Sequence, residues 1–440
     1  MTTTILSAGC PEQPALQDLT SQLVAELARA GEPDVRLLDV AALRLAYCQG
    51  EFDCWIKTPG ICRTRDDERD VLRAVHDADR LVLVDGVAFG GHGHAVKRAL
   101  DRMIPLLLPF FETRAALTHH DARYPAPASL FALGWTPRPD AELVEIWGEL
   151  TDANAINLLA PRCGAAVVDD TERARWPERI RAMLASSRAP TAAIHGRAVL
   201  RHALLDAARP AASTAPRLAP RSAAILVGSA KARGTSASEN IAHALAARLT
   251  GAGVATEIRF ATEVLHDAST GLTAALAAAD LLVLVTPLYV DALPALVTHT
   301  LELVARRATP DAWPPAFAMV VQCGFPEPEQ TRLALRIARR FCAESGRRWA
   351  GGLPLGGGGA VRPTPALDQQ HGPAEHVKRA LDAAAPALAR GDDVPAEALE
   401  LIVTSPLPDA LYRVLGNWSW RHQAHRNGLG QHALRDRPLD

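Results

Sequence analysis

One segment of the chain combines glycine, hydroxyl and cationic residues in a pattern that suits an anion. The segment is Gly228-Ser229-Ala230-Lys231-Ala232-Arg233-Gly234-Thr235-Ser236-Ala237-Ser238-Glu239. Glycines let a backbone approach a ligand closely, and hydroxyls and cations bind phosphate oxygens. The spacing is neither the P-loop pattern nor GxGxxG, so a P-loop or dinucleotide site is not indicated. The residues expected to hold a phosphate are Ser229, Lys231, Arg233, Thr235, Ser236 and Ser238.

The flanking sequence predicts a buried strand at residues 223–227 and a helix at residues 238–249. A helix that begins at this segment adds free N–H groups and the positive end of its dipole to the phosphate site. The simpler alternative is that Ser236 or Ser238 only caps the helix.

A second group of candidate residues follows the apolar run at residues 280–285. It comprises Pro287, Leu288 and Tyr289, and a later strand ends at Cys323-Gly324. Ligands of open α/β sheets bind across the carboxyl ends of the strands, so we expect these residues to share one crevice with the phosphate segment. Tyr289 either stacks on a planar ring or packs on its own helix. The glycines at 356–359 either approach a ligand or form a flexible turn.

The elements that would position these residues occur twice. The apolar run that begins at Asp79 matches the run that begins at Asp280, and Ile5 matches Ile225. Between these landmarks the first copy is longer by about 19 residues, a stretch that contains Cys48, Cys54 and Cys62. Strands that alternate with helices predict parallel sheets covered on both faces.

The sequence therefore predicts an α/β protein with two doubly wound parallel-sheet domains in tandem. We expect a first domain at 1–170 with the cysteine-bearing insert, and a helical linker rich in Pro and Ala at 171–220. A second domain at 221–400 and a C-terminal tail at 401–440 follow. The tail contains Tyr412, Trp418 and Trp420, which either pack on a domain or contribute to a dimer interface or pocket wall.

The second half resembles the flavodoxin-like NAD(P)H-dependent FMN reductases, through its GSxxxxGTSxS segment and its Thr-Pro-Leu-Tyr strand end. The first half is similar to the iron–sulfur-flavoprotein-like branch of that superfamily. The residues behind this similarity are Cys48 to Cys62, Asp66-Asp67, Phe89-Gly90-Gly91, Lys97, Asp101-Arg102 and His119 to Tyr124. The resemblance implies two flavodoxin-like folds, FMN held by its phosphate in the strand–helix segment, and NADH or NADPH as reductant.

The first copy departs from the family in the phosphate segment. Gly9 stands where relatives have serine, and Cys10-Pro11-Glu12 follows in place of hydroxyl residues. Asp85-Gly86 replaces Thr-Pro. Because Glu12 repels a phosphate, we expect FMN on the second copy and weak or no binding on the first.

The cysteine pattern departs as well, because Glu51 occupies the second position of a C-x2-C-x2-C arrangement. An iron–sulfur cluster favours four thiolates, and only Cys48, Cys54 and Cys62 remain. We therefore predict no metal. A zinc site, a redox-active pair and cysteines without a function stay open as alternatives. His119, His120 and Tyr124 are candidate substrate residues, with solvated or backbone-bonded histidines as the alternative.

Composition limits the partners. The net charge is −2, so no basic field recruits nucleic acid or an anionic membrane. No secretory signal or membrane-length apolar run is evident, and seven cysteines suit a reducing compartment, so we expect a cytoplasmic protein.

The sequence favours an NAD(P)H-dependent flavin oxidoreductase that carries FMN mainly on the second domain. In this interpretation the expected partners are a small-molecule substrate or electron acceptor and, in a possible homodimer, a second copy of the chain. One alternative is a degenerate, non-catalytic flavodoxin-like scaffold. The other is a specialised biosynthetic flavoenzyme whose first crevice binds substrate.

Overall fold

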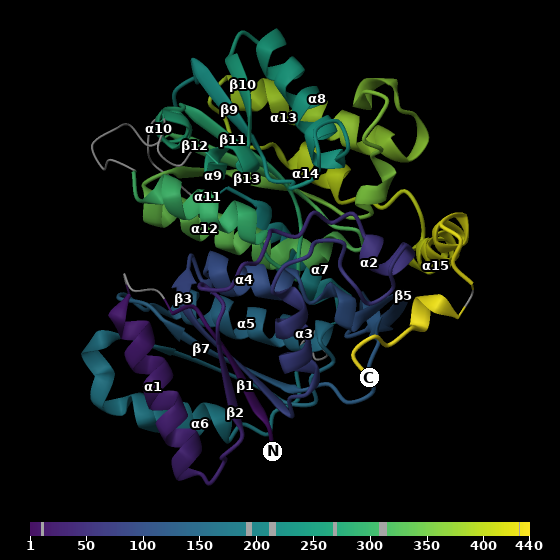
Figure 1. Cartoon of the computed structure of the whole chain (residues 1–440). Helices are drawn as coiled ribbons and strands as arrows, with labels where there is room; N and C mark the ends of the chain where they lie inside the picture. Colours follow the sequence, from purple (N-terminus) through teal and green to yellow (C-terminus); the bar gives the residue numbers. More distant parts are fainter. Residues whose placement is uncertain (10–12, 191–195, 211–216, 267–270, 308–314, 431) are drawn as a thin grey trace. The chain divides into compact units, whose positions relative to one another are not determined.

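The computed structural model describes residues 1–9, 13–190, 196–210, 217–266, 271–307, 315–430 and 432–440 (Figure 1). Backbone contacts divide the chain into two compact units, Met1–His195 together with Arg413–Asp440, and Gly196–Tyr412. The C-terminal segment thus belongs to the unit that contains the N-terminus. None of the described helices is long and apolar enough to cross a lipid bilayer.

The first unit is built on a parallel sheet with the strand order β2-β1-β3-β7-β8. A short strand, β4, pairs antiparallel with the end of β3. The strands are β1 (Thr3–Ser7), β2 (Val35–Asp39), β3 (Arg80–Ala88), β4 (Gly91–His92), β7 (Ser129–Trp135) and β8 (Cys163–Val168).

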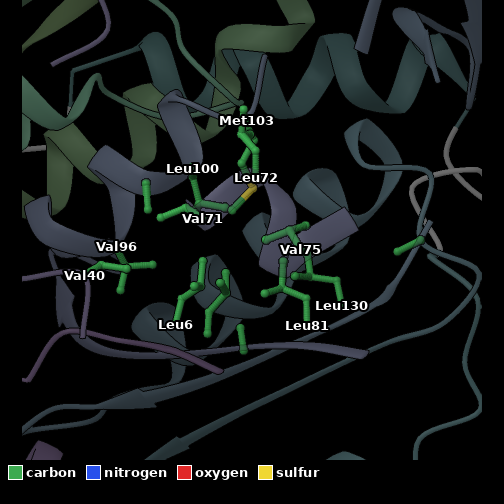
Figure 2. Packing of buried hydrophobic residues seen from close by; sticks show 14 of the residues in the cluster. Leu6, Val40, Val71, Leu72, Val75, Leu81, Val96, Leu100, Met103 and Leu130 are labelled. Carbon is green, nitrogen blue, oxygen red and sulfur yellow. The ribbon is translucent and has the colours of Figure 1, made fainter. Parts of the chain in front are cut away.

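Both faces of this sheet are covered, because side chains of one strand alternate between two cores. Leu81 and Leu83 of β3 belong to one hydrophobic cluster, and Val82 and Val84 belong to the other. The first cluster adds side chains of three helices, and Figure 2 shows it from close by. These helices are α3 (Glu68–His76), α4 (His94–Asp101) and α5 (Ala141–Asn157), whereas α1 (Pro14–Arg29) and α6 (Trp176–Leu184) contribute to the second cluster.

The second unit repeats the arrangement with the order β10-β9-β11-β12-β13, again all parallel. The central run Leu281–Val285 is at most 1% exposed. The strands are β9 (Ser222–Val227), β10 (Ala255–Phe260), β11 (Leu281–Pro287), β12 (Ala316–Gln322) and β13 (Arg348–Leu355). The helices are α7 (Arg197–Ala208), α8 (Ala237–Gly251), α9 (Ala261–His266), α10 (Gly271–Ala278), α11 (Ala295–Ala305), α12 (Arg332–Ser345), α13 (Glu375–Ala389) and α14 (Ala396–Ile402).

When only the parallel strands of each copy are numbered, both strand orders read 2-1-3-4-5, which is the order of flavodoxin-like folds. The two apolar runs that begin at Asp79 and Asp280 lie in separate sheets. The predicted fold class, two flavodoxin-like doubly wound parallel-sheet domains, is confirmed.

The first unit also contains a β-hairpin that receives the C-terminal tail. Its strands are β5 (Leu107–Arg114) and β6 (Leu117–Ala122), and the tail begins with α15 (Asp409–Arg426). The Asn417 side chain accepts the Phe111 N–H at 2.7 Å and donates to the Phe111 carbonyl at 3.3 Å. Trp420 lies against Phe52 and Trp55, with ring centroids 5.3 Å apart in both pairs.

Arg123 fixes the end of the tail. Its guanidinium is buried and donates to the carbonyls of Pro105, Leu107, Leu434 and Asp436 at 2.7–3.2 Å. Pro105 precedes the hairpin and Leu107 is the first residue of β5, whereas Leu434 and Asp436 lie in the tail. One side chain therefore joins segments that are more than 300 residues apart in sequence.

We predict that Arg123→Ala lowers the free energy of unfolding by about 3 kcal/mol or more, because it leaves several buried carbonyls without their charged donor. Urea unfolding followed by circular dichroism measures the change. Arg44→Ala is the matched control, because the exposed pair of Arg44 with Asp67 contributes about 0–1 kcal/mol. Equal losses in the two variants would contradict the role given to Arg123.

Candidate functional site

The carboxyl edge of the second sheet gathers the segments that the sequence singled out. From β9 the chain crosses to β10 on one side and returns to β11 on the other, so the switch point lies between β9 and β11. Ligands of open α/β sheets bind at this point. The loop after β9 begins with Gly228, where a Cβ would overlap Thr286 and Val297, so only glycine fits.

Ser236 caps the helix that follows this loop. Its hydroxyl accepts the Glu239 N–H at 3.1 Å at the N-terminus of α8. The Glu239 carboxylate reaches back and accepts the Gly234 N–H at 2.6 Å, which makes a variant of the capping box. The capping alternative for Ser236 is therefore observed, and a carboxylate already occupies one N–H of the loop.

The other loop residues make local contacts as well. The Lys231 N–H donates to Ser229 Oγ at 3.3 Å, and Thr235 Oγ1 donates to the Ala232 carbonyl at 2.6 Å. Arg233 forms an ion pair with Glu263, and its guanidinium lies 3.6 Å from the ring centroid of Phe260. This cation is thus held at the end of β10 by an aromatic face and a carboxylate.

Gln322 at the end of β12 links the candidate segments. Its carbonyl accepts the Leu288 N–H at 2.8 Å, and its side-chain amide donates to Ser238 Oγ at 3.3 Å. Ser238 is fully buried. The structure therefore brings the loop after β9, the residues after β11 and the Cys323-Gly324 segment to one edge.

A tight turn follows the central strand in both units. Tyr289 and Ala292 exchange two backbone hydrogen bonds at 3.1 Å, and Val290 and Asp291 between them have φ of 47° and 57°. The pair β3–β4 makes the same turn through Phe89 and Gly90, with φ of 55° and 85°. Two positive φ values in a two-residue turn are the type I′ geometry, which favours Asn and Gly. Val290 is β-branched, so the second unit carries strain at this edge.

Cys323 is a buried, neutral thiol. Burial raises its pKa to about 12, and its Sγ–H points to the carbonyls of Phe325 and Glu327 at 3.3 and 3.4 Å. The Tyr412 hydroxyl donates to the Gly324 carbonyl at 2.9 Å. Cys323 is thus poorly suited to act as a nucleophile.

The glycines at 356–359 pack against the protein itself. A Cβ at Gly356 would overlap the Pro326 carbonyl, and a Cβ at Gly358 would overlap Gln322 Oε1. Close backbone packing against the end of β12 thus accounts for these two glycines.

The corresponding edge of the first sheet is acidic. The Gly9 N–H donates to Asp39 Oδ1 at 3.1 Å, and a Cβ at Gly9 would overlap that carboxylate. Asp85 is buried and accepts the Gly93 N–H at 2.9 Å. Glu12, on which the predicted repulsion of phosphate depended, lies outside the described residues. Asp39 supplies a carboxylate beside the first loop independently of it.

His92 lies between Asp85 and Asn154. Its Nδ1 is 3.3 Å from Asp85 Oδ2, and its Nε2 is 3.1 Å from the Asn154 amide nitrogen. Burial, aided by the nearby Lys97 charge, lowers the pKa of His92 to about 3, so the ring is neutral at physiological pH.

The three cysteines of the insert line one pocket with Glu51, and its empty volume, with the solvent at its mouth, is about 370 Å³. Arg102 fixes this region through Glu68 at 3.1 Å and Asp66 at 2.9 Å. Burial raises the pKa of the Cys48 thiol to about 12 and raises the pKa values of Cys54 and Cys62. In the part of the chain that the structure describes, no three His, Cys, Asp or Glu side chains are arranged to hold a metal ion.

The candidate substrate residues His119, His120 and Tyr124 lie on the hairpin or just after it. His119 Nδ1 is 2.9 Å from Asn157 Oδ1, and His120 packs between Trp55 and Phe111. Burial, with His119 nearby, lowers the pKa of His120 to about 3. Tyr124 instead contacts His76, with ring centroids 4.6 Å apart.

Sequence reasoning missed Asp39. It placed Glu239 and Gln322 in the candidate segments and Tyr412 in the tail, but it did not predict the contacts of these three residues. The Ser-x-x-Glu spacing of Ser236 and Glu239 is a capping-box signal that could have revealed Glu239. The contacts of Asp39, Gln322 and Tyr412 join distant segments, for which no local signal exists.

We predict that Val290→Asn raises the free energy of unfolding by about 1 kcal/mol, because Asn tolerates the left-handed conformation better than Val. Thermal unfolding measures the change. Val290→Ala, which keeps a Cβ without the β-branch, should gain less. A loss of stability in the Asn variant would show that Val290 packing outweighs strain.

We predict no iron–sulfur cluster at Cys48, Cys54 and Cys62, because Glu51 replaces a thiolate. Anaerobic purification followed by iron and sulfide assays is the measurement. Stoichiometric iron with broad brown absorbance would overturn this expectation.

We predict that His120 makes the first unit acid-sensitive. Because its folded pKa of about 3 lies below the ordinary 6.5, its contribution to stability is complete above pH 6.5 and is lost as pH falls toward 3. Between pH 7 and 5, His120→Phe should lose about 2 kcal/mol less unfolding free energy than the parent chain. Urea titrations at both pH values test this, and parallel losses would exclude it.

Comparisons with known proteins give no family. No protein-family model and no curated protein matches the chain. Among solved structures, RosB with a bound 8-demethyl-8-formylriboflavin-5'-phosphate intermediate is 17% identical, with 44% of this chain and 79% of that chain covered and a TM-score of 0.31. An azoreductase from Bacillus anthracis str. Sterne is 13% identical, with 38% and 98% covered and a TM-score of 0.28. An NAD(P)H:quinone oxidoreductase from Methanothermobacter marburgensis is 17% identical, with 38% and 98% covered and a TM-score of 0.28. The fold assignment therefore depends on the strand order and register described above.

Proposed function

We propose that the protein is a cytoplasmic NAD(P)H-dependent flavin oxidoreductase that carries FMN on its second unit. The observation that carries this proposal is the position of the loop after β9. It lies at the switch point of a 2-1-3-4-5 sheet, and it leads through Ser236 into the N-terminus of the 15-residue helix α8. In flavodoxin-like sheets this is the point where FMN binds.

The residues present suit a phosphate. Ser229, Ser236 and Ser238 are buried hydroxyl residues beside a helix N-terminus, whose first N–H groups have no intrahelical acceptor. Lys231 and Arg233 supply positive charge. Bound FMN would accept a hydride from NADH or NADPH and pass electrons to a small-molecule substrate or acceptor.

The residues after β11 would flank the flavin ring. Pro287, Leu288 and Tyr289 follow the central strand, and the hydrogen bond from Leu288 to Gln322 holds them beside the Cys323-Gly324 segment. Cys323 stays protonated, so this chain contributes orientation and exclusion of water there and no thiolate chemistry.

The first unit is assigned no FMN. The Asp39 carboxylate accepts the N–H of Gly9, which stands where relatives in the resembled family have a serine. A carboxylate at this place repels a phosphate. In one variant of this proposal the protein is a specialised biosynthetic flavoenzyme, and the crevice of the first unit binds its substrate.

A non-catalytic scaffold is the second candidate, and Glu239 favours it. The Glu239 carboxylate holds the Gly234 N–H, and Glu263 pairs with Arg233, so two acids already use groups that a phosphate needs. The absorbance spectrum separates the candidates. A yellow protein with flavin bands supports the oxidoreductase, and a colourless protein that ignores added FMN supports the scaffold.

Ser236→Asp tests the site without removing the helix cap. Asp caps helices as well as Ser does, so we expect an unchanged unfolding free energy. The new carboxylate lies where the phosphate would bind, so FMN affinity measured by fluorescence quenching should fall about a hundredfold.

Asp140→Ser is the matched control, because Asp140 caps α5 of the first unit through the Leu143 N–H at 2.9 Å. It should leave both stability and FMN affinity unchanged. If Ser236→Asp binds FMN like the parent chain, the assignment of FMN to the second unit is wrong.

A further inference from the structure

The part of helix α15 that belongs to the first unit has one face fixed there. Asn417 bonds both backbone groups of Phe111, and Ala424 is buried with hairpin side chains in a small hydrophobic cluster. The Asn427 side chain donates to the Ile56 carbonyl at 3.0 Å. The three helix residues lie on one side of α15, because spacings of seven and three residues return to similar directions. Figure 1 shows α15 beside the hairpin strand β5.

The opposite face of α15 carries large apolar side chains that are exposed to solvent. Val414, Leu415 and Trp418 are 66%, 46% and 61% exposed. At 3.6 residues per turn, these positions lie within a sector of about 100°, on the side away from Ala424. Single exposed apolar residues are normal on a protein surface, but a contiguous group of them marks a site of interaction. We call Val414, Leu415 and Trp418 the outer stripe of α15.

Basic side chains continue the outer stripe toward the end of α15. His422 is stacked on Trp418 with ring centroids 5.1 Å apart, and Arg426 follows one turn later. Both residues are exposed. The segment Arg413–Asp440 contains five arginines, two aspartates and no lysine or glutamate, so its net charge is +3 in a chain whose total is −2. The expectation that no anionic membrane is recruited depended on that total, and the tail departs from it.

Two further arginines of the tail are held by one aromatic ring. The guanidinium carbons of Arg421 and Arg435 lie 4.8 and 5.0 Å from the ring centroid of Phe110. Both arginines are exposed. An aromatic ring holds a cation in place without neutralising its charge. These two charges therefore remain available to an anionic partner.

The size and the charge of this surface distinguish between possible partners. Val414 to Trp418 spans about 8 Å of helix. A specific protein interface buries about 800 Å² on each side, so the outer stripe alone is too small to hold a second copy of the chain. An anionic lipid surface needs less, namely a helix with an apolar stripe, a Trp at headgroup level and nearby cations. The observations favour the lipid surface.

We propose that the outer stripe of α15 docks the protein on the surface of anionic lipid bilayers. The three apolar side chains lie at the boundary between headgroups and acyl chains, and the arginines of the tail face the anionic headgroups. The helix lies in the plane of this boundary and does not cross the bilayer. The tail carries the whole surface, so docking does not depend on FMN at the second unit.

Cosedimentation of the full chain with lipid vesicles tests the proposal. We expect binding to vesicles of phosphatidylserine and phosphatidylcholine in equal parts. Binding to vesicles of phosphatidylcholine alone should be about tenfold weaker or more, because the headgroups then carry no net charge. High salt should weaken binding to the anionic vesicles, because it screens the attraction between exposed charges.

Two matched pairs of variants test the residues. Leu415→Ser should weaken binding to anionic vesicles about five- to tenfold, whereas Leu37→Ser on β2, where the leucine is 52% exposed, should bind like the parent chain. Arg426→Gln should weaken binding about fivefold, and Arg44→Gln, at a side chain that is 87% exposed, should not. All four side chains are exposed, so the midpoint of thermal unfolding should stay unchanged.

Three results overturn the proposal. Equal binding to the two kinds of vesicle would exclude recognition of anionic lipid, and equal affinities of Leu415→Ser and Leu37→Ser would exclude the outer stripe as the contact. The third is a parent chain that is dimeric by light scattering and becomes monomeric in Trp418→Ala. In that case the outer stripe is an interface between two copies of the chain.

Discussion

Burial of the central strands on both faces is the constraint on which each unit depends. The run Leu81–Val84 sends alternate side chains into two cores, and Leu281–Val285 is at most 1% exposed. A parallel strand buried on both sides needs helical crossovers, and these bring all carboxyl ends to one edge. Loops at that edge are free to change because the strands beneath them are fixed. The chemistry of each unit is therefore decided by a few loop residues and not by the sheet.

The two copies use equivalent positions for opposite electrostatics. Asp39 ends β2 and takes the N–H of Gly9, whereas Phe260 ends β10 and carries the guanidinium of Arg233. Register places both residues beside the last position of the neighbouring strand, Ser7 in one copy and Val227 in the other. An exchange of a carboxylate for an aromatic ring thus changes the loop from one that repels an anion to one that holds a cation.

Much of the fold could be predicted from sequence, because apolar runs and helical periodicity are local signals. The candidate segments after β9, β11 and β12 could be placed at one edge for the same reason. The hairpin Leu107–Ala122, the return of the tail to the first unit and the role of Arg123 could not be predicted. Each depends on pairing between residues far apart in sequence, such as Arg123 with Asp436, and neither partner carries a pattern of its own. The neutral state of His120 was also hidden, since it follows from burial between Trp55 and Phe111.

Strain marks the carboxyl edge of the second sheet, where FMN binding is proposed. Val290 has a positive φ and stands where Asn or Gly would cost less. The equivalent turn of the first unit has Gly90 at its second position, where a positive φ costs little, and its first residue, Phe89, is not β-branched. Strained residues persist only when the surrounding structure holds them, and they concentrate at ligand sites. The unit to which FMN is assigned therefore keeps the more strained of the two turns.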